Sequence, residues 1–153
     1  MLPPSSDYLA MVGYQGVYLK EIRTPDGRIL TNHRVPADST SAIQVVLGTD
    51  AGSLNASITD RDAKPIVNAL VCVVPASSQT VEDVAAGAVC NSVDSGTGSA
   101  SFELPPDRYF AVAFPEPEPP GRMQRLFYTR TGGSLIVIEP NGSAVASLTL
   151  SHP

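Results

Sequence analysis

The chain has 153 residues and a mass of 16.0 kDa, enough for one domain, or for one domain and a fragment, with a buried core. Hydrophobic residues make up 42% of it, which argues against intrinsic disorder. Only 16% of the residues are charged and the formal net charge is −5, so the chain lacks the broad basic face that a sequence-independent nucleic-acid binder needs.

The first 49 residues contain short runs that are typical of β-strands. Apolar and β-branched residues predict strands near 7–13, 16–23 and 41–48. Pro25-Asp26-Gly27 predicts a turn, because proline presets φ and glycine accepts a positive φ. Such hairpins cannot bury both of their faces unaided.

Part of this segment recurs later in the chain. Leu2-Pro3-Pro4 returns as Leu104-Pro105-Pro106, and Ser41-Ala42 returns as Ser143-Ala144, both at an offset of 102 residues. Tyr8 aligns with Tyr109 only after one residue is dropped, and the last strand keeps its apolar face only with a one-residue slip. An offset of this size is typical of a β-sandwich domain, so residues 1–49 are predicted to be the C-terminal half of a preceding sandwich repeat.

Residues 50–153 are predicted to form a complete all-β sandwich. Runs rich in Val, Ile, Leu, Tyr and Thr are separated by Gly, Pro, Asn or Asp, and the alternation of Ala100, Phe102 and Leu104 with polar residues is the clearest strand signal. The seven expected strands lie near 52–59, 67–74, 87–94, 98–104, 107–114, 133–139 and 143–150. The one helix we expect has one or two turns within Gln79–Ala88, where Thr80 is a plausible N-cap.

The two cysteines, Cys72 and Cys90, each lie inside a strand-like run. An even number of cysteines in a Ser- and Thr-rich chain fits one disulfide in an oxidising compartment, and the alternative is a pair of buried thiols. No apolar stretch is long enough for a membrane helix, so no membrane insertion is expected. The N-terminus lacks the pattern of a signal peptide, which would lie upstream if the chain opens inside a repeat.

Two segments resemble motifs of the carboxypeptidase regulatory-like domain family. The residues that match its first motif are Asp60, Lys64-Pro65, Asn68-Ala69 and Val71, and those that match its second are Phe102, Leu104, Pro105, Pro106 and Tyr109. Ala63 and Asp107 stand where the family has glycines, so two tight turns are expected to form with less permissive residues. The resemblance implies a prealbumin-like (Ig-like) seven-stranded sandwich and a non-catalytic spacer, adhesive or docking module.

The most unusual local composition is a proline-rich acidic segment, Phe114–Gly121, followed by a segment with three arginines, two aromatic residues and a methionine. Proline-rich runs favour polyproline II, and exposed Tyr, Phe, Met and Arg are enriched at interfaces. The candidate contact residues here are Arg122, Met123, Arg125, Phe127, Tyr128 and Arg130. The alternative is a long loop that packs its own aromatics over the sandwich edge.

Catalytic chemistry has few candidates. His33 lies in an expected loop and His152 near the C-terminus, and neither has a partner at motif spacing. Asp60-Arg61-Asp62 is interpreted as a turn, because its pattern of oxygen ligands stops at Ala63. We therefore expect no enzyme activity, no cofactor and no metal site.

The half-unit at 1–49 should leave strand edges unpaired and should leave Ile43, Val45 and Leu47 uncovered on one face. Two geometries would relieve this exposure: docking onto the chain's own 51–153 sandwich, which gives a compact monomer, or strand addition between copies of the chain. Because the complete unit already has its own seven strands, we favour the second and expect an extracellular or cell-surface structural module that forms a filament or oligomer. The alternative is a carbohydrate- or ligand-binding accessory module, although the chain has no Trp for an aromatic platform. Asn55 and Asn141 fit the N-glycosylation pattern, but we expect neither to be modified.

Overall fold

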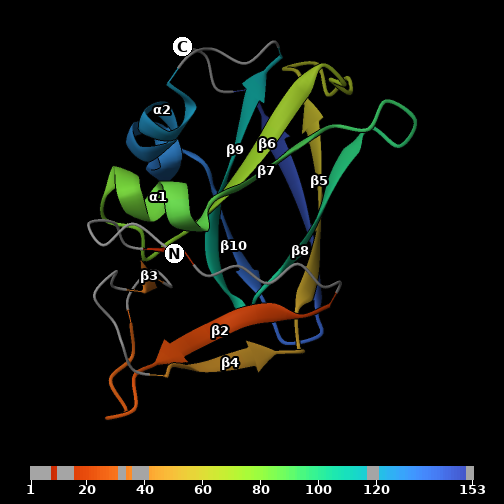
Figure 1. Ribbon diagram of the computed structural model, residues 1–153. Helices are drawn as coiled ribbons and strands as arrows, with labels where there is room; N and C mark the ends of the chain where they lie inside the picture. The colour runs from red at the N-terminus through yellow and green to blue at the C-terminus, as the bar shows by residue number, and fades with distance from the viewer. Residues whose placement is uncertain (1–7, 10–15, 31–33, 36–41, 117–120, 151–153) are drawn as a thin grey trace.

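The computed structural model describes residues 8–9, 16–30, 34–35, 42–116 and 121–150. From residue 52 onward it is a β-sandwich of two sheets, with two helices packed on the outside of one sheet (Figure 1). The four-stranded sheet has the order β10-β9-β6-β7, and the three-stranded sheet has the order β11-β5-β8. Their strands are β5 (Gly52–Thr59), β6 (Ala69–Pro75), β7 (Val89–Ser92), β8 (Ser99–Leu104), β9 (Asp107–Pro115), β10 (Ser134–Ile138) and β11 (Ser143–Thr149).

The predicted all-β sandwich is confirmed, and each of the seven expected strands overlaps an observed one. Alternate residues of β5 and β8 face the core, as the sequence pattern predicts: Leu54 and Ile58 on β5, and Phe102 and Leu104 on β8, are buried. The strand β11 runs parallel to β5, while the other pairs within the two sheets are antiparallel.

A second apolar layer lies on the outer face of the four-stranded sheet, beneath helices α1 (Val81–Gly87) and α2 (Arg122–Thr129) (Figure 1). The helix α1 is the predicted one: Thr80 is its N-cap, and the Thr80 hydroxyl and the Asp83 carboxylate form a reciprocal capping box. Val84 of α1 and Leu126 of α2 are buried against this face. In the described part of the chain, neither helix is long and apolar enough to cross a membrane.

Helix α2 was not predicted, because the preceding prolines suggested an extended segment. It starts after Gly121, which adopts a left-handed conformation (φ 74°) and makes no side-chain cap. Its apolar residues Met123, Leu126 and Phe127 have the i, i+3, i+4 spacing of a helix face that packs on a sheet. This spacing is the sequence signal that would have identified the helix.

The turn after β5 confirms one of the two strained turns expected from the sequence. Ala63 has a positive φ of 62°, and the Asp60 carboxylate stabilises the turn by accepting bonds from the backbone N–H groups of Asp62 (2.8 Å) and Lys64 (2.9 Å). The expectation for Asp107 is wrong. Asp107 begins β9 and is not among the described non-glycine residues with positive φ, because the chain enters β9 directly from the two prolines.

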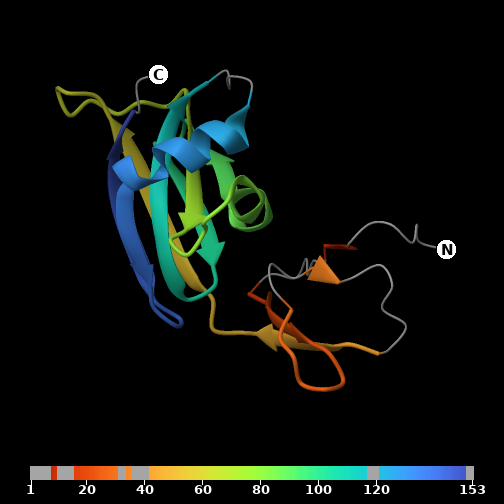
Figure 2. The same cartoon turned by 90° about the vertical axis from the view of Figure 1, so that its left-hand side faces the viewer.

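The N-terminal unit contains β1 (Tyr8–Leu9), β2 (Tyr18–Arg23), β3 (Arg34–Val35) and β4 (Gln44–Gly48). They form two separate two-stranded sheets, β1-β3 and β2-β4, so the strands expected at 16–23 and 41–48 pair with each other. The expected turn at Pro25-Asp26-Gly27 is present, and Gly27 has a positive φ of 87°. Figure 2 shows β2 and β4 lying below the sandwich, joined to it by the segment that leads from β4 into β5.

Candidate functional site

The predicted contact residues Val45 and Leu47 lie on β4, which pairs with β2, and Ile43 directly precedes β4. Leu47 lies opposite Leu19 and Val45 lies opposite Ile22, so these four side chains share one face of the pair. Leu19 and Ile22 are buried in a small cluster with Leu30, Val35 and Ile43. Val45 and Leu47 remain 46% and 49% exposed, so the cluster covers β2 but leaves β4 half uncovered.

The end of β4 is held in place by Tyr18. The Tyr18 ring lies over Gly48, where an added Cβ would stand 2.1 Å from the ring carbon Cζ, so any other residue at this position would displace the Tyr18 ring. The Tyr18 hydroxyl donates a 2.7 Å hydrogen bond to Oδ1 of Asp50, whose backbone oxygen accepts a 2.9 Å bond from the N–H of Asn141. Asp50 therefore links the N-terminal unit to the turn between β10 and β11.

The β1-β3 pair has the same register as the β9-β10 pair. Tyr8 lies opposite Val35 as Tyr109 lies opposite Ile136, and both members of the pair differ by 101 positions. Leu9 with Arg34 corresponds in the same way to Phe110 with Leu135. At this offset β4 corresponds to β11, and Val45 and Leu47 correspond to the buried core residues Ala146 and Leu148.

The two corresponding strands have different neighbours. The strand β11 pairs in parallel with β5, whereas β4 pairs antiparallel with β2. At the offset of 101 residues, the segment that forms β2 corresponds to the region around the start of α2. Among the described residues, no strand pairs with the other edge of β4.

The second group of predicted contact residues lies on α2 and on Arg130 directly after it, and several of these side chains contact the rest of the molecule. Met123 and Phe127 pack against the outer apolar layer, and Tyr128 is 71% exposed. The Arg130 guanidinium lies 4.1 Å from the centroid of the Phe127 ring and donates to the backbone oxygens of Phe127 and Ser78 (3.3 Å for Ser78). Arg130 thus connects the C-terminal end of α2 to the loop before α1, while Arg122 and Arg125 are partly exposed.

Sequence reasoning missed a further apolar patch on β10. Ile136 and Ile138 face the core, but Leu135 and Val137 point to the outer face beyond the helices and are 47% and 50% exposed. The strand β10 is at the edge of its sheet. The signal was the unbroken apolar run from Leu135 to Ile138, which is unusual for a strand with one face in solvent.

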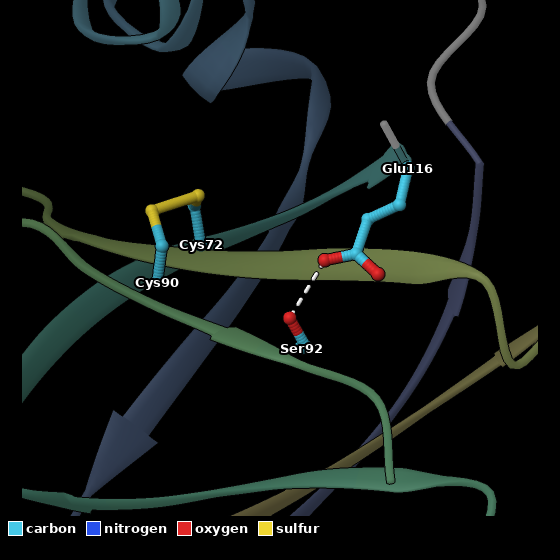
Figure 3. The surroundings of a disulfide bond; sticks show 4 residues. All are labelled: Cys72, Cys90, Ser92 and Glu116. Carbon is cyan, nitrogen blue, oxygen red and sulfur yellow. Dashed lines mark hydrogen bonds between the residues drawn. A yellow bond between two sulfur atoms is a disulfide. The ribbon is translucent and has the colours of Figure 1, made fainter. Parts of the chain in front are cut away.

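The predicted disulfide between Cys72 and Cys90 is present (Figure 3). The two cysteines lie directly opposite each other on β6 and β7, with Cα atoms 4.1 Å apart. Beside it, the Ser92 hydroxyl donates a 2.6 Å hydrogen bond to Glu116, which ties the end of β7 to the segment after β9. A disulfide of this kind forms in an oxidising compartment.

A cleft of about 650 Å³ lies between β2 and the end of the sandwich. Its lining includes Tyr18 and Lys20 from β2, and Glu103, Asp107 and Tyr109 from the sandwich. Tyr109 is buried, and its hydroxyl donates a 2.7 Å hydrogen bond to the backbone oxygen of Pro105. Burial, together with the nearby Asp107 carboxylate, raises the pKa of Tyr109.

No group of three or more His, Cys, Asp or Glu side chains that could hold a metal ion is found among the described residues. His33 and His152, the only histidines, lie outside those residues.

No protein-family model matches the chain, and no curated protein matches it in sequence. Among solved structures, the Bacillus anthracis TIE protein is similar to it with a TM-score of 0.43 and 11% sequence identity. The alignment covers 94% of this chain and 32% of that protein, so this chain spans about a third of the length of the structure it matches.

Proposed function

We propose that the chain is a non-catalytic structural module of a secreted or cell-surface protein, and that it self-associates through its N-terminal unit. The observation that carries this proposal is the exposure of β4: among the described residues one of its edges has no partner strand, and Val45 and Leu47 on one of its faces are 46% and 49% exposed. An open edge and an uncovered apolar face together favour the addition of a further strand.

The register of β1-β3 supports the interpretation of residues 1–49 as the second half of a sandwich, since it repeats that of β9-β10. The two motifs that resemble the carboxypeptidase regulatory-like domain family support the role of a structural module. The Cys72–Cys90 disulfide supports an extracellular location.

The strand β5 of the same chain cannot cover β4 in the way that it covers β11. The counterpart of β4 is β11, which pairs in parallel with β5. A parallel pair needs a connection of about a dozen or more residues, but only residues 49–51 separate β4 from β5. Both edges of β5 are also occupied already, by β11 and β8. Another copy of the chain is the simplest donor.

Sedimentation velocity tests this proposal on the full chain and on a variant that lacks residues 1–49. We expect the full chain to form oligomers or filaments and the shortened chain to remain a folded monomer. A full chain that stays monomeric at high concentration would contradict self-association, and the role of a spacer would take its place.

The alternative function is binding of a carbohydrate or another ligand as an accessory module. The observation in its favour is the cleft of about 650 Å³ beside Tyr18. A glycan array separates the two functions, because a self-associating module need not bind any sugar. Binding that is lost on substitution of Lys20, which lines the cleft, would favour the alternative.

A further inference from the structure

Two exposed apolar pairs on the molecule have the same pattern. Among the large apolar side chains that are exposed in the described residues, two pairs lie two positions apart on a strand: Val45 with Leu47 on β4, and Leu135 with Val137 on β10. Each strand has five residues, and each has one edge with no paired strand in the described part of the chain. In both strands the pair occupies a single face, because side chains alternate along a strand.

The edges of the other sandwich strands offer no such pair. On β8 the outward residues are Ser99, Ser101 and Glu103, and on β11 Val145 stands between Ser143 and Ser147. The strand β7 has four residues, and its Asn91 side chain donates a 2.8 Å hydrogen bond to the backbone oxygen of Ser101 on β8. This bond joins the edge strands β7 and β8, which lie on the same side of the sandwich.

We propose that β4 of one copy of the chain pairs antiparallel with the open edge of β10 of the next copy. This inference rests on the proposed function and names the surface that accepts the strand. With Val45 opposite Val137 and Leu47 opposite Leu135, all five residues of β4 pair with all five of β10. The two apolar pairs then form one continuous face, and the middle residue Val46 lies beside Ile136 at the rim of the core.

This contact extends the four-stranded sheet, which is antiparallel throughout, by a fifth antiparallel strand. The donor and acceptor surfaces are different parts of the chain, so the contact is heterologous. A row of copies joined in this way has a free β4 at one end and a free β10 at the other. An assembly built in this way grows as an open filament unless its rotation closes a ring.

Two complementary variants of the full chain test the proposal. Val45→Lys places a charge on the donor strand, and Leu135→Lys places one on the acceptor strand. Both positions are about half exposed, so the fold should tolerate them, and circular dichroism checks this. The wild-type chain should assemble, each variant alone should sediment as a monomer of 16.0 kDa, and an equimolar mixture should give a dimer of twice that mass and nothing larger. The reason is that only one intact donor and acceptor pair is present in the mixture.

The register is tested by cysteine cross-linking between copies. Mixed Val45→Cys and Val137→Cys chains should form an intermolecular disulfide, because directly opposite residues have the required Cα separation. Val46→Cys mixed with Val137→Cys is the control and should form none, since the two side chains would lie on opposite faces. Cross-linking of Val45→Cys with Leu135→Cys instead would overturn the antiparallel register.

The failure of this inference is distinguishable from the failure of the proposed function. If the wild-type chain assembles and either lysine variant assembles equally well, or if the two monomeric variants do not combine, the pairing of β4 with β10 is overturned while self-association stands. If the wild-type chain does not assemble, both are overturned.

Discussion

Tyr18 donates a 2.7 Å hydrogen bond to Asp50 across the segment that leads from β4 into β5. Burial of the phenol, together with this bond and the nearby carboxylate charge, raises the pKa of Tyr18 to about 12. Because the phenolic proton makes this bond, deprotonation of Tyr18 would remove a contact that holds the N-terminal unit beside the segment before β5.

The raised pKa of Tyr18 predicts a loss of stability at high pH. Between its unfolded pKa of about 10 and its folded pKa of about 12, the unfolded chain releases the phenolic proton while the folded chain keeps it, so stability falls as pH rises through this range. Denaturant unfolding at about pH 9 and about pH 11 should show a smaller loss for Tyr18→Phe than for the wild-type chain. An absorbance titration in which Tyr18→Phe removes a phenol with a pKa near 10 would contradict this assignment.

The Cys72–Cys90 disulfide closes a loop with a sequence separation of 18 residues. Reduction should lower the free energy of unfolding by roughly 3 kcal/mol, because the cross-link limits the entropy of the unfolded chain. Urea unfolding with and without reductant measures the difference. The double variant Cys72→Ala/Cys90→Ala is the control, since its stability should not respond to reductant. Two thiols that titrate in the native protein without reductant would show that the bond is absent.

Phe102 is 5% exposed and lies in the core between the two sheets. Phe102→Ala should destabilise the fold by about 3–5 kcal/mol, through lost burial and the cavity that it leaves. Its neighbour Ser101 points to solvent on the same strand, so Ser101→Ala should change stability by less than about 0.5 kcal/mol. Similar effects of the two substitutions would mean that the faces of β8 are assigned wrongly.

Ala63 adopts a left-handed conformation, which is unfavourable for a residue with a Cβ atom. Ala63→Gly should stabilise the fold by about 0.5 kcal/mol, because relief of about 1–2 kcal/mol of strain outweighs the greater freedom of glycine in the unfolded chain. The matched control is Ala85→Gly on the exposed side of α1, which should destabilise by about 1 kcal/mol. A destabilised Ala63→Gly chain would show that the turn has an ordinary conformation.

The sandwich itself could be predicted from the sequence, because its strands are short, regular runs separated by turn residues. The helix α1 was also predictable, since Thr80 and Asp83 form a local capping signal. The helix α2 has no such capping signal, and only the spacing of Met123, Leu126 and Phe127 indicates it. The apolar run from Leu135 to Ile138 indicates a strand that is apolar on both faces, but the exposure of Leu135 and Val137 depends on tertiary packing that the sequence does not show.

The strand β6 is shared by both apolar layers, and Ala69, Leu70, Val71, Cys72, Val73 and Val74 are all buried. It is also paired on both sides, with β7 and with β9. Its backbone N–H groups are bonded to β7 and β9 and both of its faces are covered, so their hydrogen exchange should follow global unfolding. The run Leu70–Val74 is apolar, uncharged and rich in valine, a composition that promotes amyloid-like aggregation. Because both of its faces are buried, this segment can aggregate only after the fold has opened.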